Sequence, residues 1–155
     1  MERMGAAGNS GSMLERNVTA EVRMSKRIVL IKDAPIPVGP YSQGVQMDGW
    51  VWTSGQLGLD PATGSLIGPD AVTQANQALH NIEVILRSAG SALNQVVRVT
   101  VFLTDMDDLS AVDAVYANYF PKDFPARSCV EVSRLPLGAR IEIDAVARVN
   151  RLASR

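Results

Sequence analysis

The stretch "PARSCVEVSRLPLGARIEIDAVA", residues 125–147, alternates polar and apolar residues on both sides of a short segment that contains proline and glycine. Alternation with a period of two is typical of β-strands, because successive side chains point to opposite faces of a sheet. The stretch therefore predicts two strands joined as a hairpin, with residues 135–138 as the turn. The apolar row of the second strand is the clearer one, and it consists of Ala139, Ile141, Ile143 and Ala145.

The polar rows of this predicted hairpin carry unusual chemistry for a surface. If the apolar rows of both strands share the core, Arg127, Cys129 and Glu142 share the opposite face of the sheet. Two interpretations follow from the pattern. The face is either a solvated face of an antiparallel sheet, which is common, or a binding site.

Composition limits the class of protein. The chain has 155 residues, of which 46% are hydrophobic and 20% charged, and this is enough for one domain with a real core. A formal net charge of -1 argues against nucleic acid as a partner. The sequence has no apolar run of about 20 residues, so we expect no association with a membrane.

The N-terminal segment differs from the rest of the chain. Residues 1–23 are small, polar and rich in glycine and serine, and we predict a flexible tail there, followed by a single domain over residues 24–155. Acidic residues in the tail argue against a mitochondrial presequence. We therefore expect a cytoplasmic protein, with mitochondria as the alternative.

Other segments complete the predicted fold. Apolar residues at spacings of three and four predict one helix between Asp70 and Gly90 and another that begins at Asp107 or Asp108. The run at residues 96–105 predicts a buried central strand, and residues 44–56 predict a hairpin. Together they predict an α+β two-layer sandwich, with both helices on one face of the sheet and the other face open or covered by another subunit.

Arg127 and Glu142 suggest the chemistry of a site on that face. A guanidinium binds a carboxylate through two parallel hydrogen bonds, and a glutamate can order or activate a water. An alternative is that the two side chains simply pair with each other. The sequence has no phosphate-binding glycine loop and no metal-ligand cluster, and no residue is identified as a base for Cys129.

Several segments together resemble one known family. They are "VGPYSQGV" at 38–45, "TSGQLGLDPATG" at 53–64, "VVRVTVFLTDMDDL" at 96–109 and "FPARSCVEVSRLPLGARIEIDAVA" at 124–147. On these segments, residues 24–149 resemble the RidA (YjgF-type) family of reactive intermediate deaminases. The resemblance implies a chorismate-mutase-like fold with a mixed six-stranded sheet, and a homotrimer with active sites in the clefts between subunits.

The resemblance also implies roles for individual residues. Arg127 would anchor a substrate carboxylate, Glu142 would orient a water, and Tyr41 would complete the catalytic group. Ser54, Gly55 and Cys129 would join Arg127 in binding substrate, and Cys129 would line the site without attacking. Asp113 stands where many relatives carry asparagine, which leaves a contact from that position open.

The implied reaction is hydrolysis of 2-iminobutanoate and 2-iminopropanoate to 2-oxo acids and ammonia. Such imines are released by pyridoxal-phosphate-dependent dehydratases that act on threonine and serine, and the resemblance implies that their hydrolysis needs neither a metal nor an organic cofactor. Two other functions stay open at this point. The protein could bind small 2-oxo acids without turning them over, or act as an endoribonuclease or translation inhibitor, a role attached to some relatives.

Overall fold

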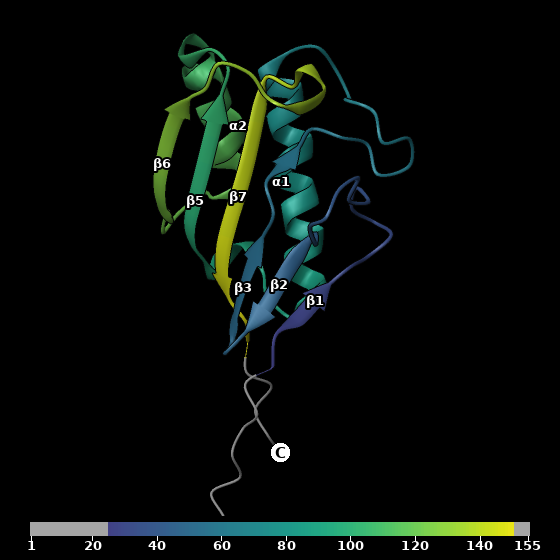
Figure 1. Ribbon diagram of the computed structural model, residues 1–155. Coiled ribbons are helices and arrows are strands. Elements are labelled where there is room, and N and C mark those ends of the chain that lie inside the picture. The colour runs from purple at the N-terminus through teal and green to yellow at the C-terminus, as the bar shows by residue number, and fades with distance from the viewer. Residues whose placement is uncertain (1–24, 151–155) are drawn as a thin grey trace, which may run out of the picture.

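The computed structural model describes residues 25–150, which form one mixed β-sheet covered by two helices (Figure 1). The predicted tail, residues 1–23, lies outside the described residues. No helix within residues 25–150 is long and apolar enough to cross a membrane. The main elements, in chain order, are β1 (Arg27–Val29), β2 (Gly44–Met47), β3 (Trp50–Thr53), β4 (Gln56–Leu57), α1 (Ala71–Ser88), β5 (Val96–Leu103), α2 (Leu109–Tyr119), β6 (Ala126–Glu131) and β7 (Ile141–Arg148).

The strands lie in the order β1-β2-β3-β7-β5-β6, and β4 pairs with β7 off this path. Among the strands within residues 25–150, only β5 and β6 are parallel; every other pair is antiparallel. The described sheet thus has seven strands where six were expected. The difference is β4, whose two residues are too short to give an alternating pattern in the sequence.

The predicted hairpin of residues 125–147 is wrong. Both strands exist, but β5 lies between them, parallel to β6 and antiparallel to β7. Parallel neighbours need a long crossover connection, and α2 provides it between β5 and β6. The segment that was expected to turn between β6 and β7 instead holds a short 3₁₀ helix, Pro136–Gly138, and carries the chain past β5.

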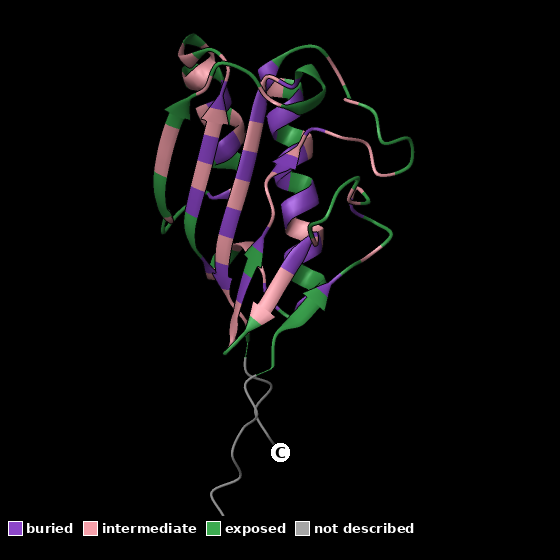
Figure 2. Cartoon of the chain, viewed as in Figure 1, coloured by how far each residue is buried: buried purple, intermediate pink, exposed green. Residues whose placement is uncertain are grey.

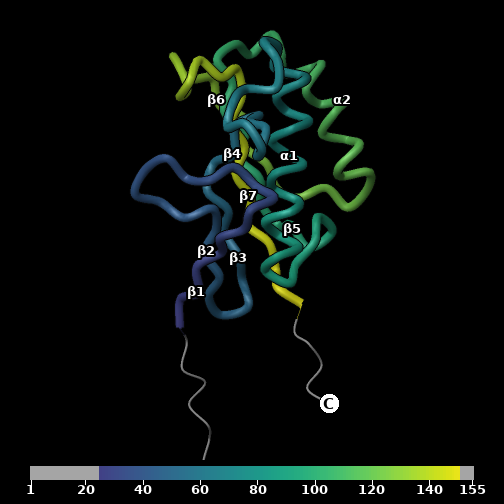
Figure 3. Tube along the Cα trace, turned by 90° about the vertical axis from the view of Figure 1, so that its right-hand side faces the viewer, coloured from purple at the N-terminus to yellow at the C-terminus, as the bar shows by residue number. Residues whose placement is uncertain are grey.

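Both helices lie on the same side of the sheet, as predicted (Figure 3). Helix α1 begins after Asp70, whose Oδ1 accepts a hydrogen bond from the Thr73 backbone N at 2.8 Å, and it ends before Gly90, which has a φ of +77°. Buried residues alternate with less buried ones along β7 and β5, so one face of each strand meets the helices (Figure 2). The shared core contains Leu79, Ile82, Val99, Val101, Leu103, Ile141 and Ile143.

The other face of the sheet keeps apolar side chains that the helices do not cover. The strand register places Ile28, Val45, Trp52 and Val146 in one row across four strands. Ile28 is 48% exposed and Trp52 is 42% exposed. This apolar row is therefore available to contact another molecule.

Candidate active site

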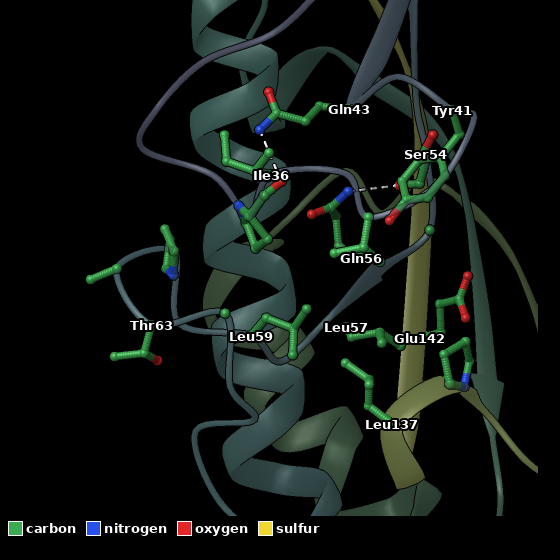
Figure 4. A pocket seen from close by; sticks show the side chains of 17 residues that line it. Ile36, Tyr41, Gln43, Ser54, Gln56, Leu57, Leu59, Thr63, Leu137 and Glu142 are labelled. Carbon is green, nitrogen blue, oxygen red and sulfur yellow. Dashed lines mark hydrogen bonds between the residues drawn. The ribbon is translucent and has the colours of Figure 1, made fainter.

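A surface cavity with a volume of about 670 Å³ gathers four predicted site residues. Tyr41, Ser54, Gly55 and Glu142 all line it, and the labelled side chains of Tyr41, Ser54 and Glu142 lie along one side (Figure 4). They come from the proline-rich loop before β2, the link between β3 and β4, and strand β7. We call this the Glu142 cavity.

A buried side chain, Gln43, holds the loop that carries Tyr41. Gln43 accepts a hydrogen bond from the Ile31 backbone N at 2.6 Å, and its amide nitrogen donates to the carbonyl oxygens of Ile31, Ala34 and Pro35 at 2.9, 3.0 and 2.9 Å. Gln43 is only 1% exposed. Buried hydrogen bonds of this kind are costly to break, so the loop has one preferred position beside the cavity.

Ser54 ties the same loop to the end of β3. Its hydroxyl donates to the carbonyl oxygen of Ser42 at 2.5 Å, and its backbone N donates to the carbonyl oxygen of Gln43 at 2.9 Å. The hydroxyl proton is therefore engaged inside the protein, while the oxygen keeps a lone pair. In this arrangement Ser54 is suited to accept a hydrogen bond from a ligand.

Glu142 lies directly against the backbone of Gly55. A Cβ added at Gly55 would sit 1.8 Å from Glu142 Oε1, so only glycine leaves room for this carboxyl group. Burial raises the pKa of Glu142, and the nearby charge of Asp144 raises it further. A carboxyl group with a raised pKa is a stronger base once ionised and is suited to proton transfer.

Arg127 lies in a second cavity of about 330 Å³, which we call the Arg127 cavity. Its Nη1 donates to Asp113 Oδ1 at 2.7 Å, and its guanidinium carbon lies 4.7 Å from the centre of the Tyr116 ring. Burial alone would lower the pKa of Arg127, but the hydrogen bond and charge of Asp113 more than offset this and raise it. Phe124 and Pro125 complete the apolar part of the wall.

The prediction that Arg127, Cys129 and Glu142 share one face is wrong. The register aligns Cys129 with the buried residues Val101 and Ile143, and it aligns Glu142 with Phe102 and Val130. By the same register Arg127 aligns with buried Val99, so Arg127 and Cys129 face the helices and Glu142 faces away from them. Direct pairing of Arg127 with Glu142 is excluded within one subunit, because the two side chains leave opposite faces of the sheet; Arg127 pairs with Asp113 instead.

The cause of this error is the position of β6 at the edge of the sheet. An edge strand has one neighbour, and every residue of β6 is exposed or half-buried. Val130, expected in the core, is 42% exposed, while Cys129 packs against the core. The apolar row of β6 therefore does not mark its buried side.

Cys129 lines neither of the two cavities described here. Burial raises the pKa of its thiol above the usual value, and this favours the protonated form, which is a poor nucleophile. Its expected part in substrate binding stays a prediction. The other substrate-binding candidates, Ser54 and Gly55, lie in the Glu142 cavity.

Sequence reasoning missed residues that complete both cavities. Tyr116 follows Asp113 by three residues on α2, and this spacing is the signal that could have linked both side chains to one face of the helix. Leu137 lines the Glu142 cavity with a φ of +58°, and nothing in the sequence indicates that conformation. Within residues 25–150, no cluster of three or more histidine, cysteine or acidic side chains is placed to hold a metal ion.

Comparison with known proteins agrees with this geometry. A family model described as Endoribonuclease L-PSP matches residues 31–149. The chain belongs to this family. A 2-iminobutanoate/2-iminopropanoate deaminase from goat (Capra hircus) is 48% identical over 122 residues, which is 79% of this chain and 89% of the relative. The resemblance to the RidA (YjgF-type) family is thereby confirmed.

Two solved structures of the family have the same fold. The YjgF gene product of E. coli is 39% identical and superposes with a TM-score of 0.76, over 80% of this chain and 99% of that one. E. coli TdcF, solved with bound serine, is 37% identical and also gives a TM-score of 0.76, over 80% of this chain and 99% of that one. The expected α+β fold is therefore confirmed.

Proposed function

We propose that this protein is an enamine/imine deaminase that hydrolyses 2-iminobutanoate and 2-iminopropanoate to 2-oxo acids and ammonia. The observation that carries the proposal is the pair of complementary groups in the two cavities. Arg127 offers a guanidinium for a substrate carboxylate, and Glu142 offers a partly buried carboxyl group with a raised pKa. The goat relative, at 48% identity, carries the name of this activity.

In the proposed reaction, Arg127 holds the substrate carboxylate and fixes the orientation of the imine carbon. The substrate reacts as the protonated imine: Glu142 takes a proton from a water as the oxygen bonds to that carbon, and a neutral carbinolamine forms. Glu142 then returns the proton to the nitrogen. The carbon–nitrogen bond breaks as the carbinolamine hydroxyl gives its proton to Glu142, and ammonia and a 2-oxo acid leave. Tyr41 and Ser54 contact the water or the nitrogen from the same wall of the cavity.

The active form in this proposal is a homotrimer whose sites lie between subunits. Arg127 and Glu142 project from opposite faces of one sheet, so one subunit cannot bring both to one small ligand. A neighbour that places its Arg127 cavity beside the Glu142 cavity would complete the site. The exposed apolar row around Trp52 supports association, since such surfaces are often buried between subunits.

The substrates reach this site from pyridoxal-phosphate-dependent dehydratases that act on threonine and serine, and the proposed compartment is the cytoplasm. A first experiment follows from this source. Threonine and a threonine dehydratase generate 2-iminobutanoate, semicarbazide traps it, and 2-oxobutanoate formation is measured with and without the protein. Wild-type protein should restore oxo-acid formation against the trap, and Arg127→Ala should not.

Arg87→Ala is the matched control, because Arg87 also pairs with a carboxylate, Glu83, but on the exposed side of α1. It should behave as wild type. If the wild-type protein does not restore 2-oxobutanoate formation in the presence of semicarbazide, the deaminase proposal is wrong. Cleavage of single-stranded RNA is measured in parallel, and cleavage without imine hydrolysis would favour the endoribonuclease function.

A mixing experiment tests the shared site. Arg127→Ala and Glu142→Gln are each expected to be inactive, and the two variants are unfolded together at equal concentration and refolded. If each site takes Arg127 from one subunit and Glu142 from its neighbour, about one quarter of the sites regain both residues in random trimers. Recovery of no activity would refute the shared site, provided that refolded wild type is active.

A further inference from the structure

Arg127 already has a carboxylate partner before any ligand binds. Asp113, on α2, accepts from Arg127 Nη1 at 2.7 Å, and no step of the proposed reaction uses it. The Arg127 side chain is 26% exposed and that of Asp113 is 45% exposed. The guanidinium is thus more enclosed than its partner, which lies nearer the solvent at the rim of the cavity.

We propose that Asp113 is a resident counter-ion that limits how much negative charge Arg127 accepts from a ligand, so that the site favours singly charged 2-imino and 2-oxo acids over doubly charged ones. This inference rests on the proposed function, since it requires a ligand carboxylate at Arg127. It adds a selection rule to that function: monocarboxylates are accepted, and dicarboxylates are disfavoured.

The geometry restricts where a ligand carboxylate can bind. Asp113 occupies the Nη1 donor, and the Tyr116 ring covers one face of the guanidinium at 4.7 Å. A planar guanidinium keeps donors on its other edges. A ligand carboxylate on one of these edges shares the same cation with Asp113, at a separation of about 6 Å between the two carboxylate carbons.

The charges in the Arg127 cavity decide whether Asp113 strengthens or weakens the binding of an anionic ligand. Its remaining lining residues, Tyr116, Ala117, Phe124 and Pro125, carry no charge in ordinary solution, so the Arg127–Asp113 pair is close to neutral as a whole. Repulsion between single charges about 6 Å apart in a water-like medium corresponds to about a 3-fold loss of affinity. A ligand with two negative charges loses about 10-fold if both lie at this range. Because Asp113 is nearly half exposed, the water-like estimate is the appropriate one.

The test compares ligands of different charge on variants of matched shape. Asp113→Asn keeps an oxygen that accepts from Arg127 but removes the charge. Glu83→Gln is the control, because it removes one charge from a different arginine pair, on α1. Calorimetry measures the dissociation constants of 2-oxobutanamide, 2-oxobutanoate and 2-oxoglutarate, which carry no, one and two negative charges. Thermal melting checks that each variant is folded, and Asp113→Ser replaces Asp113→Asn if the latter is not.

We expect Asp113→Asn to tighten binding of 2-oxobutanoate about 3-fold and of 2-oxoglutarate about 10-fold, and to leave 2-oxobutanamide unchanged. The gain should shrink in high salt, where charge repulsion is screened. In turnover, KM for 2-iminobutanoate should fall by more than kcat changes. Glu83→Gln should alter none of these values.

Equal or weaker binding of 2-oxobutanoate to Asp113→Asn would overturn the inference, and so would an equal gain for all three ligands. Arg127→Ala separates this failure from failure of the proposed function. If Arg127→Ala abolishes binding of 2-oxobutanoate while Asp113→Asn has no charge-dependent effect, only the role of Asp113 is wrong. If Arg127→Ala leaves binding unchanged, the carboxylate anchor is wrong as well.

Discussion

Replacement of Gly55 by alanine should remove Glu142 from its working position. The added Cβ would lie 1.8 Å from Glu142 Oε1, 2.7 Å from its Cδ and 2.9 Å from its Cγ. All three are atoms of a flexible side chain, and Gly55 does not have a positive φ of the kind that only glycine adopts readily. The backbone can therefore stay in place while the carboxyl group is pushed out of the cavity.

Two magnitudes follow from this collision. Overpacking of this kind costs about 1–3 kcal/mol of stability, and the lower half of that range applies because Glu142 can move. Loss of a positioned general base lowers the rate by about 10²–10⁴-fold. Gly55→Ala should therefore reduce deaminase activity about as much as Glu142→Gln does, at a modest cost in stability.

The assay is a pair of double-mutant cycles followed by urea unfolding at fixed protein concentration, with turnover measured on the same samples. Glu142→Ala should relieve the collision, so that Gly55→Ala costs at least 1 kcal/mol less in that background than in wild type. Gly58→Ala is the control, because its Cβ would lie 2.5 Å from the Cα of Gln74 in α1, where the backbone cannot yield. Glu142→Ala should not rescue Gly58→Ala.

The reasoning would be refuted if Gly55→Ala retained wild-type activity. It would also be refuted if Glu142→Ala restored no stability to Gly55→Ala, since the two side chains would then not compete for the same space. Equal rescue of Gly55→Ala and Gly58→Ala would show a general effect of Glu142→Ala on the fold, and would count against the specific contact.

Three further predictions concern stability. Burial raises the pKa of Glu142 above its usual 4.5, so the native state keeps this proton to a higher pH than the unfolded state does, and the stability that the protonated group contributes is lost as pH rises through the native pKa. Glu142→Gln should therefore gain stability relative to wild type between pH 4 and pH 8, as measured by urea unfolding. A constant difference in stability over this range would contradict the prediction. Tyr116 has a buried hydroxyl without a hydrogen-bond partner among the described residues, and burial raises its pKa to about 12. Tyr116→Phe should leave thermal stability unchanged or raise it by up to about 1 kcal/mol, because the ring beneath Arg127 is kept; a loss of that size would imply a partner for the hydroxyl. Gln43→Leu removes four hydrogen bonds to the loop before β2 and should cost about 2–4 kcal/mol, with faster amide exchange at Ile31; unchanged exchange there would show that the loop has other supports.

Local features of the fold were predictable because they depend on neighbouring residues. Asp70 and Gly90 bound α1 through capping and a positive φ, and both signals are visible in the sequence. The turn at Asp48 and Gly49 has positive φ at both residues, as the hairpin pattern predicts. The alternation of Ile141 with Glu142 correctly assigned the buried face of β7.

The arrangement of the site depends on contacts between distant segments, which alternation does not encode. Strand β5 separates β6 from β7, and β6 lies at the edge of the sheet with its apolar row exposed, so Arg127 and Glu142 face opposite sides. Four of the predicted site residues line one cavity, and these residues come from the family motifs. The position of Arg127 on the other face of the sheet follows only from the order and register of the strands. Arg127 and Asp113 lie 14 residues apart in the sequence and on different elements, and no local pattern predicts their pairing.

The place of β7 has a consequence for biosynthesis. It is the last strand of the described chain, yet it pairs with β3, β4 and β5 in the interior of the sheet. A ribosome therefore produces the β1–β3 and β5–β6 segments before the strand that joins them. Until Ile141–Arg148 leaves the exit tunnel, the nascent chain exposes two unpaired strand edges, which are favourable sites for chaperone binding or misassociation. A ribosome stalled before Ile141 should therefore display a chain that proteases cut readily.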